Sequence, residues 1–513
     1  MKEELTERAP IGIASTSGNA SGVLEPRIRI GFVSLGCPKN LVDSEVMMGL
    51  LDQAGAEITN HPETADILVV NTCSFIDKAK QESIDTILQM AEHKVSGKAR
   101  KLIVAGCLVE RYRDEIRKNI PEVDAVVGTG ELEAILAAAG LEAPDPPPLD
   151  PPQLFSILRS DAGQNVASRA EGDLRESQGR FARETWEGAQ PKLPQYLYDH
   201  TTPRLLATRK SSAYIKIAEG CDHPCSFCVI PNLRGKFRSR RFASVVAEAE
   251  QLVAQGVREL TLIGQDTTCY GEDLGMKDGL AQLLDSLAQI PDLKWLRFLY
   301  AYPNKITGRL LDTIARHEVI CKYLDMPLQH ASGPVLKSMR RGGNADIFLK
   351  TIERVRASVP GVALRSTFIT GFPGETEADF AVLSDFVRAA KLDWLGVFSY
   401  SDEEGSGAFH LGNKVPSRTI EARRRSLMRL QQSISRESRA SLVGRNFELL
   451  VEGASEETPL LWEGRTEHQA PEIDGKVFIN DFGPFDQLNP GHFYQCEITE
   501  SQDYDLVGRI VAQ

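Results

Sequence analysis

Cys221, Cys225 and Cys228 stand close together in the segment GCDHPCSFCVIP. The spacing C-x3-C-x2-C puts three thiolates on one loop, where they can bind three corners of a cuboidal [4Fe–4S] cluster. The fourth iron would then have no protein ligand and could coordinate an atom of a substrate. A structural zinc site is the alternative, but it needs a fourth ligand, for which His223 is the nearby candidate. We therefore expect an iron–sulfur cluster with one open iron.

A second set of three cysteines lies at equivalent positions along the first part of the chain. Cys37, Cys73 and Cys107 each end an apolar segment typical of a β-strand: IRIGFVSLGC, ADILVVNTC and KLIVAGC. The carboxyl ends of parallel strands open onto one crevice, so these thiols can converge on a second cluster with an open iron. Three unrelated core cysteines are the alternative. The remaining cysteines, which we expect to be packed thiols, are Cys269, Cys321 and Cys496.

The secondary-structure elements that must position these cysteines fall into three regions, of which two alternate strands with helices and one consists mainly of strands. Strand and helix patterns alternate over residues 28–140, which predicts a parallel-sheet βα domain with four strands. Six strand patterns separated by helical ones occupy residues 214–400 and predict a partial TIM-type (βα) barrel, two units short of eight. A long basic helix is expected at 417–439. Four strand patterns after it, NFELLVEG, GKVFIND, FYQCEITES and YDLVGRIVAQ, predict a small β-barrel within 440–513.

Two segments lack such patterns. Residues 1–27 mix Gly, Ser, Thr, Pro and charged residues and are expected to be a mobile tail. Residues 141–206 are expected to be a proline-rich linker or insertion, beginning with PDPPPLDPP. The central domain, with its trailing basic helix, is therefore expected to span 207–439.

Composition limits the class of protein. The chain has 513 residues, nine cysteines and a formal net charge of −12, which excludes a disulfide-dense scaffold. The start, MKEELTERAP, lacks the features of a signal peptide, and no apolar run approaches the ~20 residues needed to cross a bilayer. We expect a cytoplasmic protein with reduced thiols, no membrane partner and no sequence-specific binding to DNA.

Three further segments fall at the carboxyl face of the predicted barrel, where ligands bind. The glycine-rich GFPGET begins at Gly371, Gln265 and Asp266 follow the second strand, and Gln329 follows the fourth. Glycine lets a backbone approach a ligand closely, although a helix-entry turn would also explain it. One interpretation is that Gln329 and the adjacent His330 face the substrate, but a structural role with satisfied hydrogen bonds is at least as well supported for His330.

The three predicted domains and their two cysteine sets together resemble the methylthiotransferases of the radical S-adenosylmethionine superfamily, over 28–140 and 207–513. The resemblance implies two [4Fe–4S] clusters, S-adenosylmethionine, a C-terminal TRAM domain and an electron donor such as flavodoxin or ferredoxin. It implies Phe227, Gln265 and Gly371 as cofactor-binding residues, and no catalytic residue beyond the cluster ligands. The linker, usually shorter in this family, is a departure from its pattern.

Several segments look like the RimO type, which modifies the β-carbon of an aspartate in ribosomal protein S-twelve, including SLGCPKNLVDSE and CDHPCSFCVIPNLRGKFRSR. Residues 440–513 carry 14 acidic and 4 basic residues, a net charge of 4 − 14 = −10. An acidic module suits a Lys/Arg-rich protein substrate better than RNA phosphate, although a solvated surface would also explain it. The alternatives are methylthiolation of tRNA adenosines, which the basic helix would favour, and a zinc-bound ribosome or RNA adaptor.

Overall fold

A computed structural model describes residues 27–143, 196–455, 458 and 461–512. The predicted tail, apart from Arg27, and residues 144–195 of the predicted linker lie outside the described residues. The end of that predicted linker is packed rather than extended. Tyr198 is buried, and its hydroxyl donates to Glu248.

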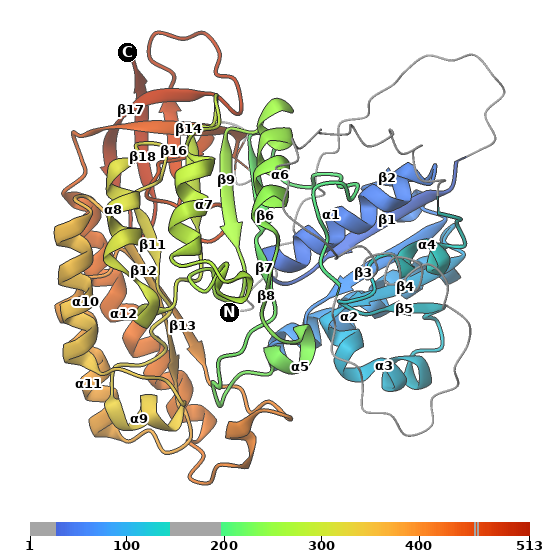
Figure 1. Cartoon of the computed structure of the whole chain (residues 1–513), viewed down its shortest axis with the longest axis horizontal. Coiled ribbons are helices and arrows are strands. Elements are labelled where there is room, and N and C mark those ends of the chain that lie inside the picture. The colour runs from blue at the N-terminus through green and yellow to red at the C-terminus, as the bar shows by residue number, and fades with distance from the viewer. Residues whose placement is uncertain (1–26, 144–195, 456–457, 459–460, 513) are drawn as a thin grey trace, which may run out of the picture. The chain divides into compact units, whose positions relative to one another are not determined.

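The N-terminal domain is the predicted parallel sheet (Figure 1). Its strand order is β2-β1-β3-β4-β5, and all neighbouring strands are parallel. The central strand β3 has every residue buried, as its apolar sequence requires. The short edge strand β2 adds to the four predicted strands. The strands are β1 (Arg29–Ser34), β2 (Glu57–Thr59), β3 (Ile67–Thr72), β4 (Lys101–Gly106) and β5 (Ala125–Val127), and the helices are α1 (Pro38–Gln53), α2 (Asp77–Val95), α3 (Cys107–Asn119) and α4 (Ala134–Ala139).

The central domain contains the six predicted strands in two parallel sheets, β10-β9-β6 and β11-β12-β13. A parallel bridge between Leu296 and Ile320 lies where the chain passes from one sheet to the other, so the strands follow chain order around a partial barrel. The fold class predicted for this domain is confirmed. The strands are β6 (Ser212–Lys216), β9 (Glu259–Ile263), β10 (Trp295–Phe298), β11 (Tyr323–Asp325), β12 (Ala363–Thr370) and β13 (Trp394–Ser399).

Helices follow these strands and cover one side of the two sheets (Figure 1). A small antiparallel hairpin of β7 (Ala218–Glu219) and β8 (Arg238–Ser239) brackets the segment with Cys221, Cys225 and Cys228. The helices are α5 (Ile230–Arg234), α6 (Phe242–Ala254), α7 (Gly279–Leu287), α8 (Gly308–Arg316), α9 (Gly333–Ser338), α10 (Ala345–Ser358), α11 (Glu377–Ala390) and α12 (Ser417–Ala440). The last of these is the predicted basic helix.

The C-terminal region is a closed five-stranded barrel in the order β14-β15-β16-β18-β17. Its interior is apolar and includes Leu449, Val451 and Ile479. The strand β15 was not predicted. The strands are β14 (Asn446–Ala454), β15 (Trp462–Arg465), β16 (Val477–Asp481), β17 (Phe493–Ser501) and β18 (Leu506–Val511).

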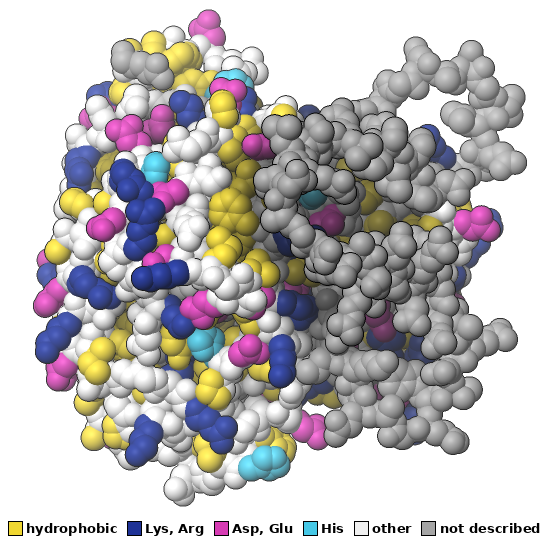
Figure 2. Space-filling model, viewed as in Figure 1, with side chains coloured by type: hydrophobic (Ala, Val, Ile, Leu, Met, Phe, Trp, Pro, Cys, Tyr) yellow, Lys and Arg dark blue, Asp and Glu magenta, His cyan; other side chains and the backbone are white. Residues whose placement is uncertain are grey.

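The described surface is charged and mixed. On the face in Figure 2, acidic and basic side chains alternate over the helices of the central domain rather than forming a field of one sign. Among the described helices, none combines the length and the apolarity needed to cross a membrane.

Candidate functional site

The hairpin of β7 and β8 fixes both ends of the loop that carries Cys221, Cys225 and Cys228. The Cys221 amide donates to the carbonyl of Gly235 at 3.2 Å. Gly220 adopts a φ of 76°, and a Cβ there would lie 2.1 Å from the Lys236 carbonyl oxygen, so the chain enters this loop through a position that requires glycine.

The thiols of this loop form one partly buried group. Burial, reinforced by the charge of neighbouring Cys225, raises the pKa of Cys221 to about 11 and that of Cys228 to about 12. A bound cation would favour the thiolate forms of Cys221 and Cys228 in such surroundings. This donor set therefore fits an iron–sulfur cluster, whose irons bind thiolates at three corners. The structure brings the three predicted ligands together on one loop.

Cys37, Cys73 and Cys107 meet at the carboxyl edge of the N-terminal sheet. Cys37 directly precedes α1, Cys73 follows β3, and Cys107 is the first residue of α3. A Cβ on Gly36, which has a φ of 91°, would lie 2.8 Å from Cys73 Cβ and 3.1 Å from its Sγ. Glycine thus leaves room beside the Cys73 sulfur, a cradle that a larger residue would fill.

These three thiols also influence one another electrically. Burial raises the pKa of Cys107 to about 12, and the charges of Cys73 and Cys37 act in the same direction. Burial also favours a raised pKa for Cys37, but Lys39 and Arg234 outweigh it, so that its pKa is lowered. The three thiols thus follow neighbouring strands of one sheet, the arrangement that the predicted second cluster needs.

Buried charged side chains lie between the elements that carry the two cysteine sets. Arg234, in α5, donates from Nη1 to Glu219 at 3.1 Å and from Nη2 to Asn40 Oδ1 at 3.0 Å. Lys216 donates to Glu219 at 2.6 Å and also to Asp43, one turn along α1 from Asn40. Sequence reasoning missed this network. Its only local signal was the charged segment NLRGKFRSR directly after the cysteine loop.

Gln265 joins this network and has an unused acceptor. Its Nε2 donates to Glu219 Oε1 at 3.0 Å, whereas Oε1 is buried and has no hydrogen-bond partner among the described residues. Such an oxygen normally needs a donor. An amide or hydroxyl group of a bound molecule would satisfy it, which is consistent with the predicted role of Gln265 in cofactor binding.

The other predicted site residues differ in what surrounds them. Phe227 is half-buried against the core of the central domain. Gly371 has a φ of 80° and donates its amide to Glu375 at 2.5 Å. A Cβ on Gly371 would lie 2.2 Å from Ile420 of α12, so packing alone already requires glycine there. His330 is fully buried and accepts from the Ser332 amide at 2.9 Å, whereas its Nε2 has no hydrogen-bond partner among the described residues and lies 3.7 Å from Glu375.

A group that sequence reasoning missed lies beside the cysteine loop. His223 Nε2 and Asp266 Oδ2 are 2.6 Å apart, and the His223 ring stacks on that of Tyr302 with centroids 4.0 Å apart. The Cys269 thiol donates to the same Asp266 oxygen at 3.1 Å. Asp266 was predicted to lie at this face. Cys269 belongs to the same loop as Asp266, whereas His223 and Tyr302 come from two other loops, so no local sequence signal joins the group.

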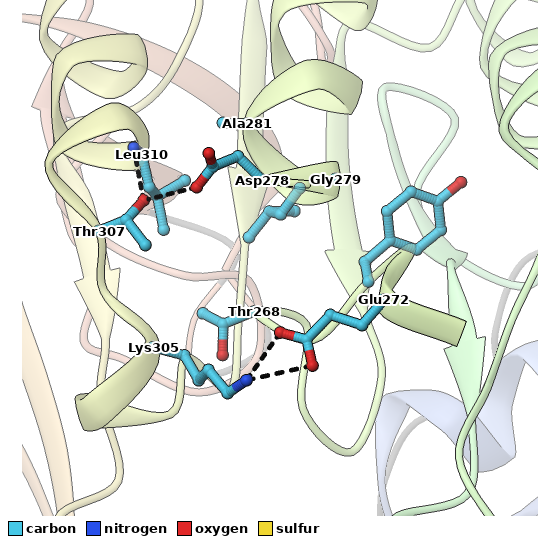
Figure 3. A pocket seen from close by; sticks show the side chains of 10 residues that line it. Thr268, Glu272, Asp278, Gly279, Ala281, Lys305, Thr307 and Leu310 are labelled. Carbon is cyan, nitrogen blue, oxygen red and sulfur yellow. Dashed lines mark hydrogen bonds and ion pairs between the residues drawn. The ribbon is translucent and has the colours of Figure 1, made fainter. Parts of the chain in front are cut away.

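A small pocket nearby is not the cofactor site. Its volume is about 60 Å³, far below the ~300 Å³ that small-molecule sites usually have. Figure 3 shows that the ion pair of Lys305 and Glu272, at 2.7 Å, lies among its lining residues.

Comparisons with known proteins agree with this architecture. Family models match at residues 29–128 (uncharacterized protein family UPF0004), 215–387 (radical SAM superfamily) and 443–511 (TRAM domain). A relative from Koribacter versatilis, named ribosomal protein uS12 methylthiotransferase RimO, is 65% identical over 97% of this chain and 99% of its own length. Relatives of the same name from Solibacter usitatus and Pelotomaculum thermopropionicum are 56% and 45% identical over 94% of this chain, and over 95% and 99% of their own lengths.

The parallel-sheet domain, the barrel with its cysteine loop and the closed β-barrel define a radical SAM enzyme of the methylthiotransferase class. Identity extends through all three domains and is high enough to show the family. The chain belongs to the ribosomal protein uS12 methylthiotransferase RimO family. The family resemblance inferred from the sequence segments is thereby confirmed.

Proposed function

We propose that this enzyme installs a methylthio group on the β-carbon of an aspartate in ribosomal protein uS12. The observation that carries the proposal is the 65% identity, over nearly the whole of both chains, to a relative that bears this activity in its name. The two sets of cysteines fit the chemistry that such a reaction needs, because the β-C–H bond of an aspartate side chain is only very weakly acidic and its carbon is not electrophilic, whereas a carbon radical can abstract the hydrogen atom.

In this proposal, Cys221, Cys225 and Cys228 hold one [4Fe–4S] cluster, and Cys37, Cys73 and Cys107 hold a second. When bound, the first cluster would supply the electron that cleaves one S-adenosylmethionine into methionine and a hydrogen-abstracting 5′-deoxyadenosyl radical, the second cluster would supply the sulfur, and another S-adenosylmethionine would supply the methyl group. An external donor such as flavodoxin or ferredoxin would deliver the electron.

The residues between the two sets then have defined tasks. Gln265 presents its unpaired oxygen to S-adenosylmethionine, while Glu219 fixes its amide nitrogen at 3.0 Å. The positive charge of Arg234 favours the thiolate form of Cys37, and its hydrogen bond to Asn40 links α1 to the hairpin before the cysteine loop. Lys39 reaches from α1 to the Gly264 carbonyl at 3.2 Å and lies over the Tyr300 ring, so it links the N-terminal domain to the loops of the central domain.

Mass spectrometry of cells that lack this protein tests the proposal. Ribosomal protein uS12 should lose the mass of one methylthio substitution on a single aspartate, and the wild-type gene should restore it. Methylthioadenosines in tRNA from the same cells should stay unchanged. Loss of methylthioadenosine with an unaltered uS12 would show instead that the enzyme modifies tRNA.

A further inference from the structure

Arg341, just beyond α9, touches the sulfur of a predicted cluster ligand. Its Nη1 donates to Cys225 Sγ at 3.5 Å, and its Nη2 donates to the Pro327 carbonyl at 2.8 Å. Two hydrogen bonds in different directions fix the plane of the guanidinium group. One edge of that plane therefore faces the cysteine loop.

A stack of planar groups holds the same guanidinium from the side. Its Cζ lies over the Tyr302 ring, 4.5 Å from the centroid, while the His223 ring stacks on Tyr302 at 4.0 Å and an interplanar angle of 8°. The His223 ring at that distance covers one face of Tyr302, so Arg341 must lie against the other face of Tyr302. Asp266 in turn fixes His223 through Nε2 at 2.6 Å. The Arg341 guanidinium is thus held from several directions, unlike that of a typical exposed arginine.

We propose that Arg341 tunes the reduction potential of the cluster held by Cys221, Cys225 and Cys228 through its hydrogen bond to Cys225 Sγ. The inference rests on the proposed function for the presence of that cluster. A positive donor aimed at a ligand sulfur stabilises the cluster more as it gains an electron, because the reduced form carries more negative charge. Arg341 therefore raises the potential and makes the cluster easier to reduce.

The stack explains why the residue is an arginine held in place. With Cζ over the Tyr302 ring, the Nη1 and Nη2 groups donate to Cys225 and to Pro327, a combination that an ammonium group cannot reproduce. Tyr302 and His223 are positioning residues in this scheme, since they act on the sulfur through Arg341.

The test is a redox titration of the full-length chain with Cys37, Cys73 and Cys107 replaced by alanine, so that one cluster remains. The titration is followed by absorbance and by electron paramagnetic resonance, without S-adenosylmethionine. In Arg341→Met the one-electron reduction equilibrium should become about tenfold less favourable, a potential lower by about 59 mV. Arg340→Met is the matched control. Arg340 is exposed and makes no hydrogen bond to Cys225 among the described residues, and its replacement removes the same charge.

Iron analysis separates the two levels of the argument. A colourless protein without iron in the parent chain would contradict the proposed cluster, and with it the proposed function. A full complement of iron with equal potentials in Arg341→Met and the parent would overturn this inference alone. The same holds if both arginine variants shift equally, since bulk charge would then suffice. If Arg341→Met fails to assemble a cluster, Tyr302→Leu, which removes the stacking platform, should lower the potential in the same direction, and an unchanged potential there would overturn the inference.

Discussion

Arg234 donates to both carboxylate oxygens of Glu219 at 3.1 Å, and both side chains are almost completely buried. The same guanidinium reaches Asn40 in α1, so one buried cation links the helix after Cys37 to the hairpin before Cys221. Removal of one member of such a pair leaves an uncompensated charge in a medium that solvates it poorly.

Arg234→Met should therefore lower the free energy of unfolding by about 3–5 kcal/mol, the usual cost of breaking a buried ion pair. Urea denaturation of the apoprotein measures the change. Arg117→Met is a suitable control, because Arg117 is exposed on α3, and it should change stability by about 0.5 kcal/mol or less. Equal urea midpoints for the two variants would contradict the structural role given to Arg234.

Alanine replacements should separate the two sets of cysteines. Replacement of Cys221, Cys225 and Cys228 should abolish the formation of 5′-deoxyadenosine. Replacement of Cys37, Cys73 and Cys107 should preserve it but stop the transfer of sulfur to uS12. Chromatography of the small-molecule products and mass spectrometry of uS12 give the two readouts, and the anaerobically reconstituted parent should hold about eight irons. Continued methylthiolation without the second set would show that those thiols are ordinary core residues.

Gln265→Leu should weaken the binding of S-adenosylmethionine about tenfold, because the loss of one hydrogen bond to a buried group costs about 1.4 kcal/mol. Equilibrium dialysis of the reconstituted protein against labelled S-adenosylmethionine measures this affinity. The matched variant Gln251→Leu changes an exposed side chain of α6 and should leave the affinity intact. Equal affinities in the two variants would remove Gln265 from the binding site.

Local sequence was sufficient for most of the fold, including the strands that Cys37, Cys73 and Cys107 follow. Long apolar strands and the cysteines that end them can be recognised from the local sequence, because burial on both faces of the sheet requires continuous apolar residues. The strand β15 cannot be recognised in this way, because its sequence is WEGR. Its Glu463 pairs with Arg209 and Lys476, and its Arg465 pairs with Glu259 and Glu452. Buried charges of this kind are stable only with partners that are distant in sequence, so no local pattern predicts them.

The same partnership makes stability depend on pH. Burial alone would raise the pKa of Glu259, but Arg465 and Arg297 more than offset it and hold the pKa at about 2. A carboxylate with a depressed pKa stabilises the fold above its unfolded pKa, near 4.5, and that contribution disappears as the pH falls to about 2. The shift of 4.5 − 2 corresponds to about 3 kcal/mol.

Unfolding in urea between pH 6 and pH 2 should show this contribution as a difference between two proteins. Glu259→Gln should be less stable than the parent at pH 6, because Arg465 and Arg297 then lack their anion, and its stability should fall less steeply with acid. The difference removes the titration of all other carboxylates. Parallel stability curves for the two proteins would contradict the role assigned to Glu259.

The acidic C-terminal barrel should recruit the basic protein substrate. Neutralisation of its exposed carboxylates should lower kcat/KM for uS12 about tenfold at low ionic strength, because steering depends on the field of the whole module. The variant to make is E448Q, D481N, D486N and E500Q combined.

Several readouts distinguish steering from a loss of structure or chemistry. The defect should shrink as salt is added, since about 0.15 M salt already screens charges beyond about 8 Å. Formation of 5′-deoxyadenosine without uS12 should stay at the parental rate, because the barrel carries none of the predicted cluster ligands. A control that removes four exposed carboxylates from the central domain combines E250Q, D312N, E318Q and E353Q. If this control loses as much kcat/KM as the barrel variant, the total charge of the enzyme, rather than the C-terminal barrel, attracts uS12.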